Sequence, residues 1–335
     1  MKVFELNLPQ ALEQMARKIG ILLALASTTN ALSVLVVGVS GGTGQRAFRG
    51  LVAGGLDAPK ISFLTRSPER PAAQALSALG ATPVVADLDD AASLARAVSD
   101  ATYDGVYVHG LAGDEKRIDT EEAPRAARLA AALRSLDAPP LVVYNSAAAD
   151  DDTGIPRIEQ KHAVERAFQG ALPRTAMLRA HLFMEELWKD YTRPGIKKGT
   201  YSFSVPRDKP LCLTSVKDMG VVAARCLLEA RTGTLEVVSD VRTPGGLADD
   251  FAAAQGGAVV HKQAWALYWI SKFALPELHQ IMNFYRKTDF SPAIDARDAF
   301  AASFAELPPL QSFASFLEET KWSDADRTYE DLARP

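Results

Sequence analysis

The chain has 335 residues, of which 47% are apolar and 23% charged, and this composition excludes fibrous and disordered classes. Its net charge of −4, without a dense basic run, argues against nucleic acid as a partner. Cys212 and Cys226 are too few for a disulfide framework or a cysteine-rich zinc site, and we expect no metal. The longest apolar run, Ile19–Ala26, is far shorter than the roughly 20 residues of a membrane span.

The first 32 residues allow two interpretations. Residues 15–31 have a basic start, the apolar run Ile19–Ala26 and a small polar end, which is the layout of a signal peptide. The acidic Glu5 and Glu13 lie upstream, where such signals are normally basic, and the apolar spacing also fits an amphipathic helix. We expect a cytoplasmic protein, with the secretory pathway or an organelle as the alternative.

Strand and helix signals alternate from residue 33 onward. The run 33–38 (SVLVVG) is continuously apolar, as in strands that are buried on both faces. Further strands are expected at 61–65, 83–86, 105–109, 141–145, 175–178 and 235–239, and helices at 43–53, 71–79, 91–98, 122–136, 158–168, 214–230 and 243–254. This alternation predicts an α/β fold with a Rossmann-type, doubly wound parallel sheet. We expect a Rossmann domain at 33–180 and a smaller, mostly helical region at 181–335, interleaved with the first.

A glycine-rich loop follows the first strand directly and opens the first helix. Its glycines at 38, 41 and 44 allow a tight turn, close backbone approach to a pyrophosphate, and close packing of helix on strand. Free amides at the start of the helix would hold the phosphate charge. The candidate dinucleotide-binding residues of this loop are Gly38, Ser40, Gly41, Gly42, Thr43, Gly44 and Gln45.

The ends of the next three strands indicate which dinucleotide would bind. Arg66 and Arg70 follow the second strand, where an NAD site usually carries an acidic residue, and guanidinium groups suit a 2′-phosphate. This favours NADP(H), unless both arginines are solvated loop residues. Asp87 and Leu88 would meet the adenine, although Asp87 also fits a helix N-cap. His109 and Gly110 end the fourth strand beside the expected path of the cofactor, with His109 either a base or structural.

The order of motifs resembles the NmrA-like family, an atypical branch of the NADP-binding short-chain dehydrogenase/reductase superfamily. After the glycine loop come TRSPER, ADLDD, Ser146 behind the fifth strand, IEQKHAVERAF around Lys161, LRAHLFMEEL, LTSVKDMG and PLQSFASFLEE. The resemblance covers about residues 33–320. It implies that Lys161 lies over the nicotinamide ribose, that Arg66 binds the 2′-phosphate, and that Ser40–Thr43 hold the pyrophosphate. It also implies that the nicotinamide end is lined by Phe183, Met184, Glu185 and Glu186.

The sequence departs from the wider superfamily at the proton donor. Typical members have a tyrosine four residues before the lysine, helped by a serine. Here Ser146 is present, but Arg157 stands four residues before Lys161. An arginine, with a pKa above about 12, cannot supply a proton near neutral pH. The usual carbonyl-reducing machinery is therefore incomplete.

Two hypotheses of function fit this departure. The first is an NADPH-dependent oxidoreductase for a small apolar carbonyl or quinone-like substrate, with Lys161 as the acid–base group and His181 as a further candidate acid. The second is a non-catalytic NADP(H) sensor that binds a protein partner and uses Lys161 only as a ribose ligand. Some reductases of this superfamily resemble the first kind of protein, and several regulatory NmrA-like proteins resemble the second.

A cluster of aromatic residues near the C-terminus adds one more expectation. Trp265, Tyr268 and Trp269 share one helix face. We expect this face to be core between helices. The alternatives are an apolar wall for the substrate, completed by Leu182 and Phe183, or an interface with a subunit or partner.

Overall fold

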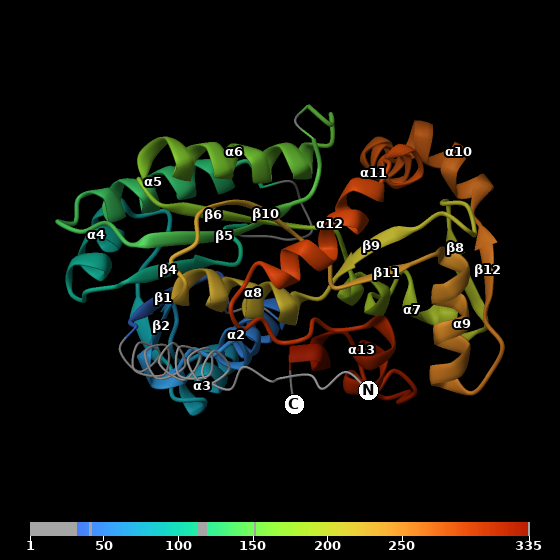
Figure 1. The fold of residues 1–335 in the computed structure, drawn as a ribbon, viewed down its shortest axis with the longest axis horizontal. Helices are drawn as coiled ribbons and strands as arrows, with labels where there is room; N and C mark the ends of the chain where they lie inside the picture. The colour runs from blue at the N-terminus through green and yellow to red at the C-terminus, as the bar shows by residue number, and fades with distance from the viewer. Residues whose placement is uncertain (1–31, 40–41, 113–118, 151, 334–335) are drawn as a thin grey trace, which may run out of the picture.

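The computed structural model describes residues 32–39, 42–112, 119–150 and 152–333 (Figure 1). The candidate targeting segment at 15–31, and Ser40 and Gly41 of the glycine loop, lie outside the described residues. Among the helices of the described part of the chain, none is long and apolar enough to cross a membrane.

A seven-stranded parallel sheet forms the centre of the molecule. Its strand order is β10-β6-β5-β4-β1-β2-β3. The strands are β1 (Val34–Val37), β2 (Ile61–Thr65), β3 (Thr82–Val85), β4 (Gly105–Val108), β5 (Leu141–Ala147), β6 (Thr175–Ala180) and β10 (Gly233–Val237). All four residues of β1 are buried, because helices cover both faces of the sheet. The predicted Rossmann-type α/β fold is therefore confirmed.

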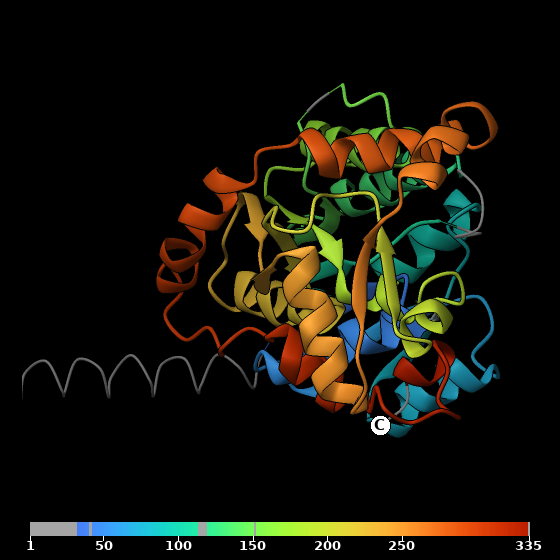
Figure 2. The ribbon, with the colours of Figure 1, turned by 90° about the vertical axis from the view of Figure 1, so that its right-hand side faces the viewer.

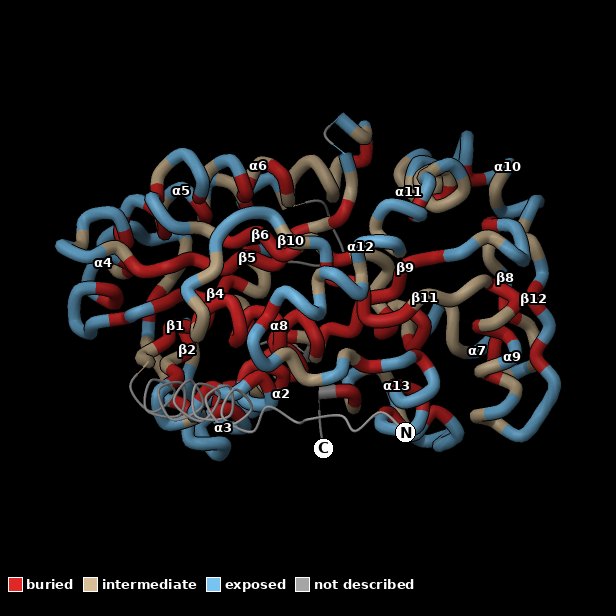
Figure 3. Tube along the Cα trace, in the orientation of Figure 1, coloured by how far each residue is buried: buried red, intermediate tan, exposed pale blue. Residues whose placement is uncertain are grey.

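Helices pack on both faces of this sheet, as Figures 1 and 3 show. One face is covered by α2 (Gly42–Ala53), α3 (Pro71–Ala78) and α8 (Val216–Leu228). The other face is covered by α4 (Ala91–Ser99), α5 (Glu122–Arg134) and α6 (Pro156–Ala171). The predicted strands and helices up to residue 180 all form, and their ends shift by a few residues at most.

The remaining elements form what we call the C-terminal region, which faces the viewer in Figure 2. It contains a three-stranded sheet, β11-β9-β7, and a pair, β12-β8. Its strands are β7 (Leu182–Phe183), β8 (Thr200–Phe203), β9 (Leu211–Thr214), β11 (Asp240–Arg242) and β12 (Val260–Gln263). Its helices are α7 (Arg193–Lys197), α9 (Pro244–Gln255), α10 (Trp265–Ala274), α11 (Pro276–Lys287), α12 (Ser291–Ala302) and α13 (Phe313–Glu319). The short 3-10 turns η2 (Met184–Trp188) and η3 (Glu330–Ala333) belong to this region, whereas η1 (Ala58–Lys60) directly precedes β2. Between β9 and β11 the chain returns to the central sheet as α8 and β10.

Helices α2 and α8 touch backbone to backbone. A Cβ atom at Gly220 would lie 2.0 Å from the carbonyl oxygen of Ala47, and one at Gly50 would lie 1.9 Å from that of Lys217. Neither distance leaves room for a methyl group. The helix that follows the glycine loop is therefore held tightly against α8.

A buried ion pair joins α2 to the C-terminal region. The Nε atom of Arg46, on α2, lies 2.8 Å from Oε1 of Glu185 in η2, and both side chains are nearly inaccessible. The same carboxylate accepts the N–H of Val216 at the start of α8. Arg46 also donates to Gln311 and pairs with Glu319. Four separate chain segments therefore meet at one guanidinium group.

Gly220→Ala should destabilise the protein by about 1–3 kcal/mol, because the added methyl group must separate α2 from α8. Gly170→Ala is the matched control, since a Cβ at that helical position meets nothing within 4 Å and should be neutral or slightly stabilising. Guanidinium unfolding midpoints of the two variants measure the difference. Equal midpoints would contradict the close helix contact.

Candidate functional site

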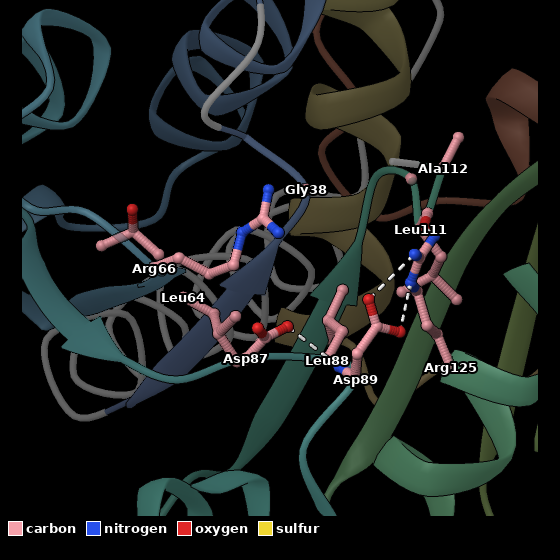
Figure 4. A pocket seen from close by; sticks show the side chains of 11 residues that line it. Gly38, Leu64, Arg66, Asp87, Leu88, Asp89, Leu111, Ala112 and Arg125 are labelled. Atoms are coloured by element: carbon pink, nitrogen blue, oxygen red, sulfur yellow. Dashed lines mark hydrogen bonds and ion pairs between the residues drawn. The ribbon is translucent and has the colours of Figure 1, made fainter. Parts of the chain in front are cut away.

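A pocket lies at the carboxyl edge of the central sheet, where the strand order reverses around β1 (Figure 4). Such crevices are where open α/β sheets bind their ligands. The pocket is built from the segments that follow β1 to β4, together with one side chain of α5. It is lined by Gly38, Leu64, Thr65, Arg66, Asp87, Leu88, Asp89, Gly110, Leu111, Ala112 and Arg125.

Two glycines make the turn after β1 possible. Gly38 has a φ of +83°, and a Cβ atom there would lie 2.2 Å from the carbonyl oxygen of Gly110. Gly44 packs against Val39, whose Cα would lie 2.4 Å from a Cβ at that position. A Cβ at Gly110, in contrast, would meet nothing within 4 Å. The turn is thus pressed against the end of β4, while the pocket side of Gly110 stays open.

Arg66 is the cationic side chain at the end of β2 that lines the pocket. It is exposed, and the described part of the chain offers it no hydrogen bond or ion pair (Figure 4). Arg70 occupies the N-cap position of α3 and does not line the pocket. The sequence suggested Arg66 and Arg70 together as ligands of a 2′-phosphate, but in the structure Arg66 lines the pocket and Arg70 does not.

Asp87 and Leu88 both line the pocket. The carboxylate of Asp87 accepts the N–H of Asp89 and does not cap α4. That cap is made by Asp90, whose side chain accepts the N–H groups of Ala92 and Ser93. The suggested capping role of Asp87 is therefore wrong, because α4 begins at Ala91 and its N-cap position lies three residues after Asp87.

An arginine–aspartate cluster fixes the two loops that frame the pocket. Arg125 donates through Nε and Nη2 to the two oxygens of Asp89, at 2.9 and 3.0 Å, and through Nη1 to the carbonyl of Leu111. Arg128 donates to the carbonyl of Leu88. Hydrogen bonds from Arg125 lower the pKa of Asp89, so that this carboxylate stays charged. Sequence reasoning missed this cluster, because the facing side of α5 cannot be read from an alanine-rich helix.

His109 connects the glycine loop to β5. Its Nδ1 lies 3.2 Å from the hydroxyl of Tyr107 and 3.3 Å from the amide nitrogen of Asn145, and its Nε2 lies 3.5 Å from the hydroxyl of Thr43. Burial, followed by the charge of Lys161, lowers the pKa of His109 to about 4. The ring is therefore neutral at physiological pH, and two donors at Nδ1 favour a proton on Nε2.

Lys161 does not stand alone in the site. Its ammonium group donates to Oε2 of Glu122 at 2.6 Å, and this carboxylate at the start of α5 is almost fully buried. The Oγ of Ser146, at the end of β5, is buried and has no hydrogen-bond partner among the described residues. Glu122 was missed by sequence reasoning, because its partner lies 39 residues away.

The segment expected to line the nicotinamide end divides into two pairs. The side chains of Met184 and Glu185 are buried in the structure. Burial raises the pKa of Glu185, and Arg46 opposes this shift. Phe183 and Glu186 keep accessible surface, and Glu186 pairs with Lys189 at 2.8 Å.

The structure also gives a position to each of the weaker acid candidates. The Nε2 of His181 lies 3.1 Å from Glu236 on β10, and its ring packs edge-on against Phe290. Arg157, which replaces the superfamily tyrosine, pairs with Glu277 on α11 at 3.1 Å. Tyr191 follows η2 by three residues, and its hydroxyl donates a hydrogen bond to the carboxylate of Glu186. Sequence reasoning had not singled out this residue.

The aromatic face of α10 is not core. Trp265 and Trp269 are exposed, and only Tyr268 of the three predicted residues turns partly inward. The expected packing between helices is therefore wrong, since α11 covers just one side of α10.

Residues 31–282 match the model of the NmrA-like family. The chain belongs to this family. No curated protein matches its sequence. An NADPH-dependent quinone oxidoreductase from Escherichia coli, crystallised with NADPH, has a similar structure, with a TM-score of 0.65 and 19% identity over 85% of this chain and 99% of that one. The triphenylmethane reductase of Citrobacter sp., complexed with NADP(H), gives a TM-score of 0.65 and 18% identity over 86% and 99%. Both likenesses concern the fold.

The low pKa of His109 predicts a pH-dependent stability. Between pH 6.5 and about 4 the unfolded ring takes up a proton that the folded ring does not, so the free energy of unfolding falls as pH falls. From pH 7 to pH 5 wild type should lose about 2 kcal/mol more than His109→Gln. Guanidinium unfolding at both pH values measures this loss, and an NMR titration showing the ring protonated near pH 6.5 would contradict it.

Proposed function

We propose that this protein is an NADPH-dependent oxidoreductase that reduces a small apolar carbonyl or quinone-like substrate. The observation that carries the proposal is Arg66, a guanidinium without a partner among the described residues, at the rim of a pocket formed by the glycine turn and the ends of β2, β3 and β4. No acidic residue stands at the end of β2, where NAD-binding sites usually carry one. The quinone oxidoreductase and the dye reductase named above, which share the fold, were crystallised with NADPH or NADP(H).

The residues present fit a dinucleotide. The side of Gly110 that a Cβ would occupy is open, and α2 begins at Gly42 directly after the glycine turn, so that its N-terminus could bind a pyrophosphate as this fold requires. Leu64, Leu88 and Leu111 give the pocket an apolar lining suited to an adenine ring. Arg66 would bind the 2′-phosphate through charge-assisted hydrogen bonds. The bound cofactor supplies the hydride.

The chain's own residues orient the reactants and manage the proton. Lys161, one turn beyond Arg157 on α6, would bind the ribose hydroxyls and stay fixed by Glu122. Neutral His109 would hold Thr43 of the glycine loop against β5. The hydroxyl of Ser146, which has no hydrogen-bond partner in the part of the chain that the structure describes, would donate to a substrate oxygen that gains charge.

The identity of the acceptor follows from the missing acid. At position 157 an arginine paired with Glu277 cannot release a proton at neutral pH. A quinone needs less acid assistance than a simple ketone, because the charge of its reduced form is delocalised over the ring. We therefore place quinones ahead of aliphatic carbonyls as substrates.

A regulatory protein that binds NADP(H) without turnover is the second candidate. It is favoured by one observation, that Lys161 and Arg157 both have carboxylate partners in the structure. Such a protein would need Arg66 and the glycine turn, and no proton donor.

Arg66→Ala should weaken NADPH binding about tenfold to a hundredfold and leave NADH binding nearly unchanged, since only NADPH carries the 2′-phosphate. Fluorescence titration with both nucleotides measures the two affinities. Arg96→Ala, an exposed arginine on α4 away from the pocket, is the matched control. An equal loss for both nucleotides would contradict the assigned contact.

Lys161→Met should lower NADPH oxidation by a quinone at least ~100-fold, while Arg66-dependent binding persists. Stopped-flow or steady-state absorbance of NADPH with a panel of quinones and aldehydes measures turnover. Tight binding of NADPH by wild type, with no turnover across the panel, would support the regulatory protein. Absence of binding for either nucleotide would overturn both candidates.

A further inference from the structure

Helix α10 turns its apolar side to the solvent. Six large apolar side chains between residues 265 and 275 are exposed, and most of this stretch is pale blue in Figure 3. Their exposed fractions are 47% for Trp265, 44% for Leu267, 56% for Trp269, 61% for Ile270, 83% for Phe273 and 52% for Leu275. Trp265, Trp269 and Phe273 are spaced four residues apart and therefore form one line along the helix. We call these six residues the α10 apolar face.

The side of α10 that packs on the protein is the polar one. Ser271 is its one buried residue, and the Ser271 hydroxyl donates to the carbonyl of Tyr268. The hydroxyl of Tyr268 donates to Asn283 of α11 at 2.6 Å, and the Nδ1 of His279 lies 3.0 Å from the carbonyl of Tyr268. A helix on the surface of a globular protein usually buries its apolar side and exposes its polar side to water, which is the opposite of α10. The arrangement therefore indicates a surface that is covered in use.

The charge around this face is opposite to that of the whole chain. Residues 257–288 contain Lys262, Lys272, Arg286 and Lys287 but one acidic residue, Glu277, in a chain of net charge −4. Glu277 is itself paired with Arg157. Lys262, Lys272 and Lys287 are exposed. With Asp289 included, residues 257–289 still carry more basic than acidic side chains. An apolar face with Lys272 on its own helix and Lys262 three residues before that helix is complementary to an anionic surface.

We propose that the α10 apolar face docks the protein on the surface of an anionic lipid bilayer. Tryptophan and phenylalanine concentrate at the boundary between headgroups and acyl chains, and helices that lie in this plane combine such an apolar side with flanking lysines. Lysines near the membrane are attracted to anionic headgroups. Protein interfaces are depleted in lysine, which makes a protein partner the poorer fit. This inference is independent of the proposed function.

The proposed docking surface is joined directly to the candidate site. α11 begins at Pro276, immediately after Leu275, and Glu277 in its first turn pairs with Arg157 on α6. A bilayer in contact with α10 would therefore lie next to the start of α11, which is paired with the helix that carries Lys161.

The test is flotation of the full chain with vesicles of phosphatidylcholine, with and without phosphatidylglycerol. We expect binding to the anionic vesicles alone, with a blue shift of tryptophan emission. The double variant Trp269→Gln with Phe273→Gln should lose binding, and Lys272→Glu should weaken it by ~tenfold. Leu79→Gln, which removes an exposed apolar residue on α3, is the matched control and should bind as wild type.

Three outcomes would overturn the proposal. The first is an absence of binding to either vesicle, and the second is binding that persists in the double variant, which would assign it to another part of the chain. The third is a wild-type dimer in light scattering that the double variant converts to monomer, with no vesicle binding, which would make the face a subunit interface. Circular dichroism spectra of all variants should overlay, because the substituted side chains are exposed.

Discussion

The buried pair of Arg46 and Glu185 is the interaction on which the arrangement of the two parts of the molecule depends. Burial makes each charge costly by itself, and removing one partner of such a pair typically costs about 3–5 kcal/mol. The carboxylate is held further by the N–H of Val216, so that α2, η2 and α8 meet at one point. Because Glu185 is fixed here, its neighbours Phe183 and Glu186 are placed at the surface beside the carboxyl edge of the sheet. The pair thus fixes the position of η2 relative to α2 and α8.

The charges of the site divide it into two functional halves. Lys161, Arg125 and Arg157 each have a carboxylate partner, whereas Arg66 has none in the described part of the chain. Paired cations hold loops and helices in place and contribute little net field, while an unpaired one attracts an anion. Among the described residues, the half of the site around Arg66 therefore carries the uncompensated charge. The half around Lys161 and His109 is a network of neutral or charge-compensated groups.

The fold was predictable from local pattern, and much of the site was not. The run 33–38 and the glycines at 38 and 44 are short-range features, and the structure gives each of them the predicted conformation or contact. Which residue pairs with Lys161, and whether Glu185 is buried, depend on which faces of distant helices meet. The spacing of residues within one segment does not determine this. Helix α10 shows a second limit of the sequence. The spacing of its aromatic residues correctly predicts an apolar face, but the same spacing occurs whether that face packs on the protein or faces the solvent.

Arg157 links two helices that are far apart in the sequence. Its guanidinium forms an ion pair with Glu277 that crosses from α6 to α11. This pair is partly exposed and contributes little to stability, so its value lies in positioning. It brings the start of α11 to the helix that carries Lys161, and with it the end of α10. The helix that carries Lys161 and the exposed apolar face are therefore connected through one side chain, that of Arg157.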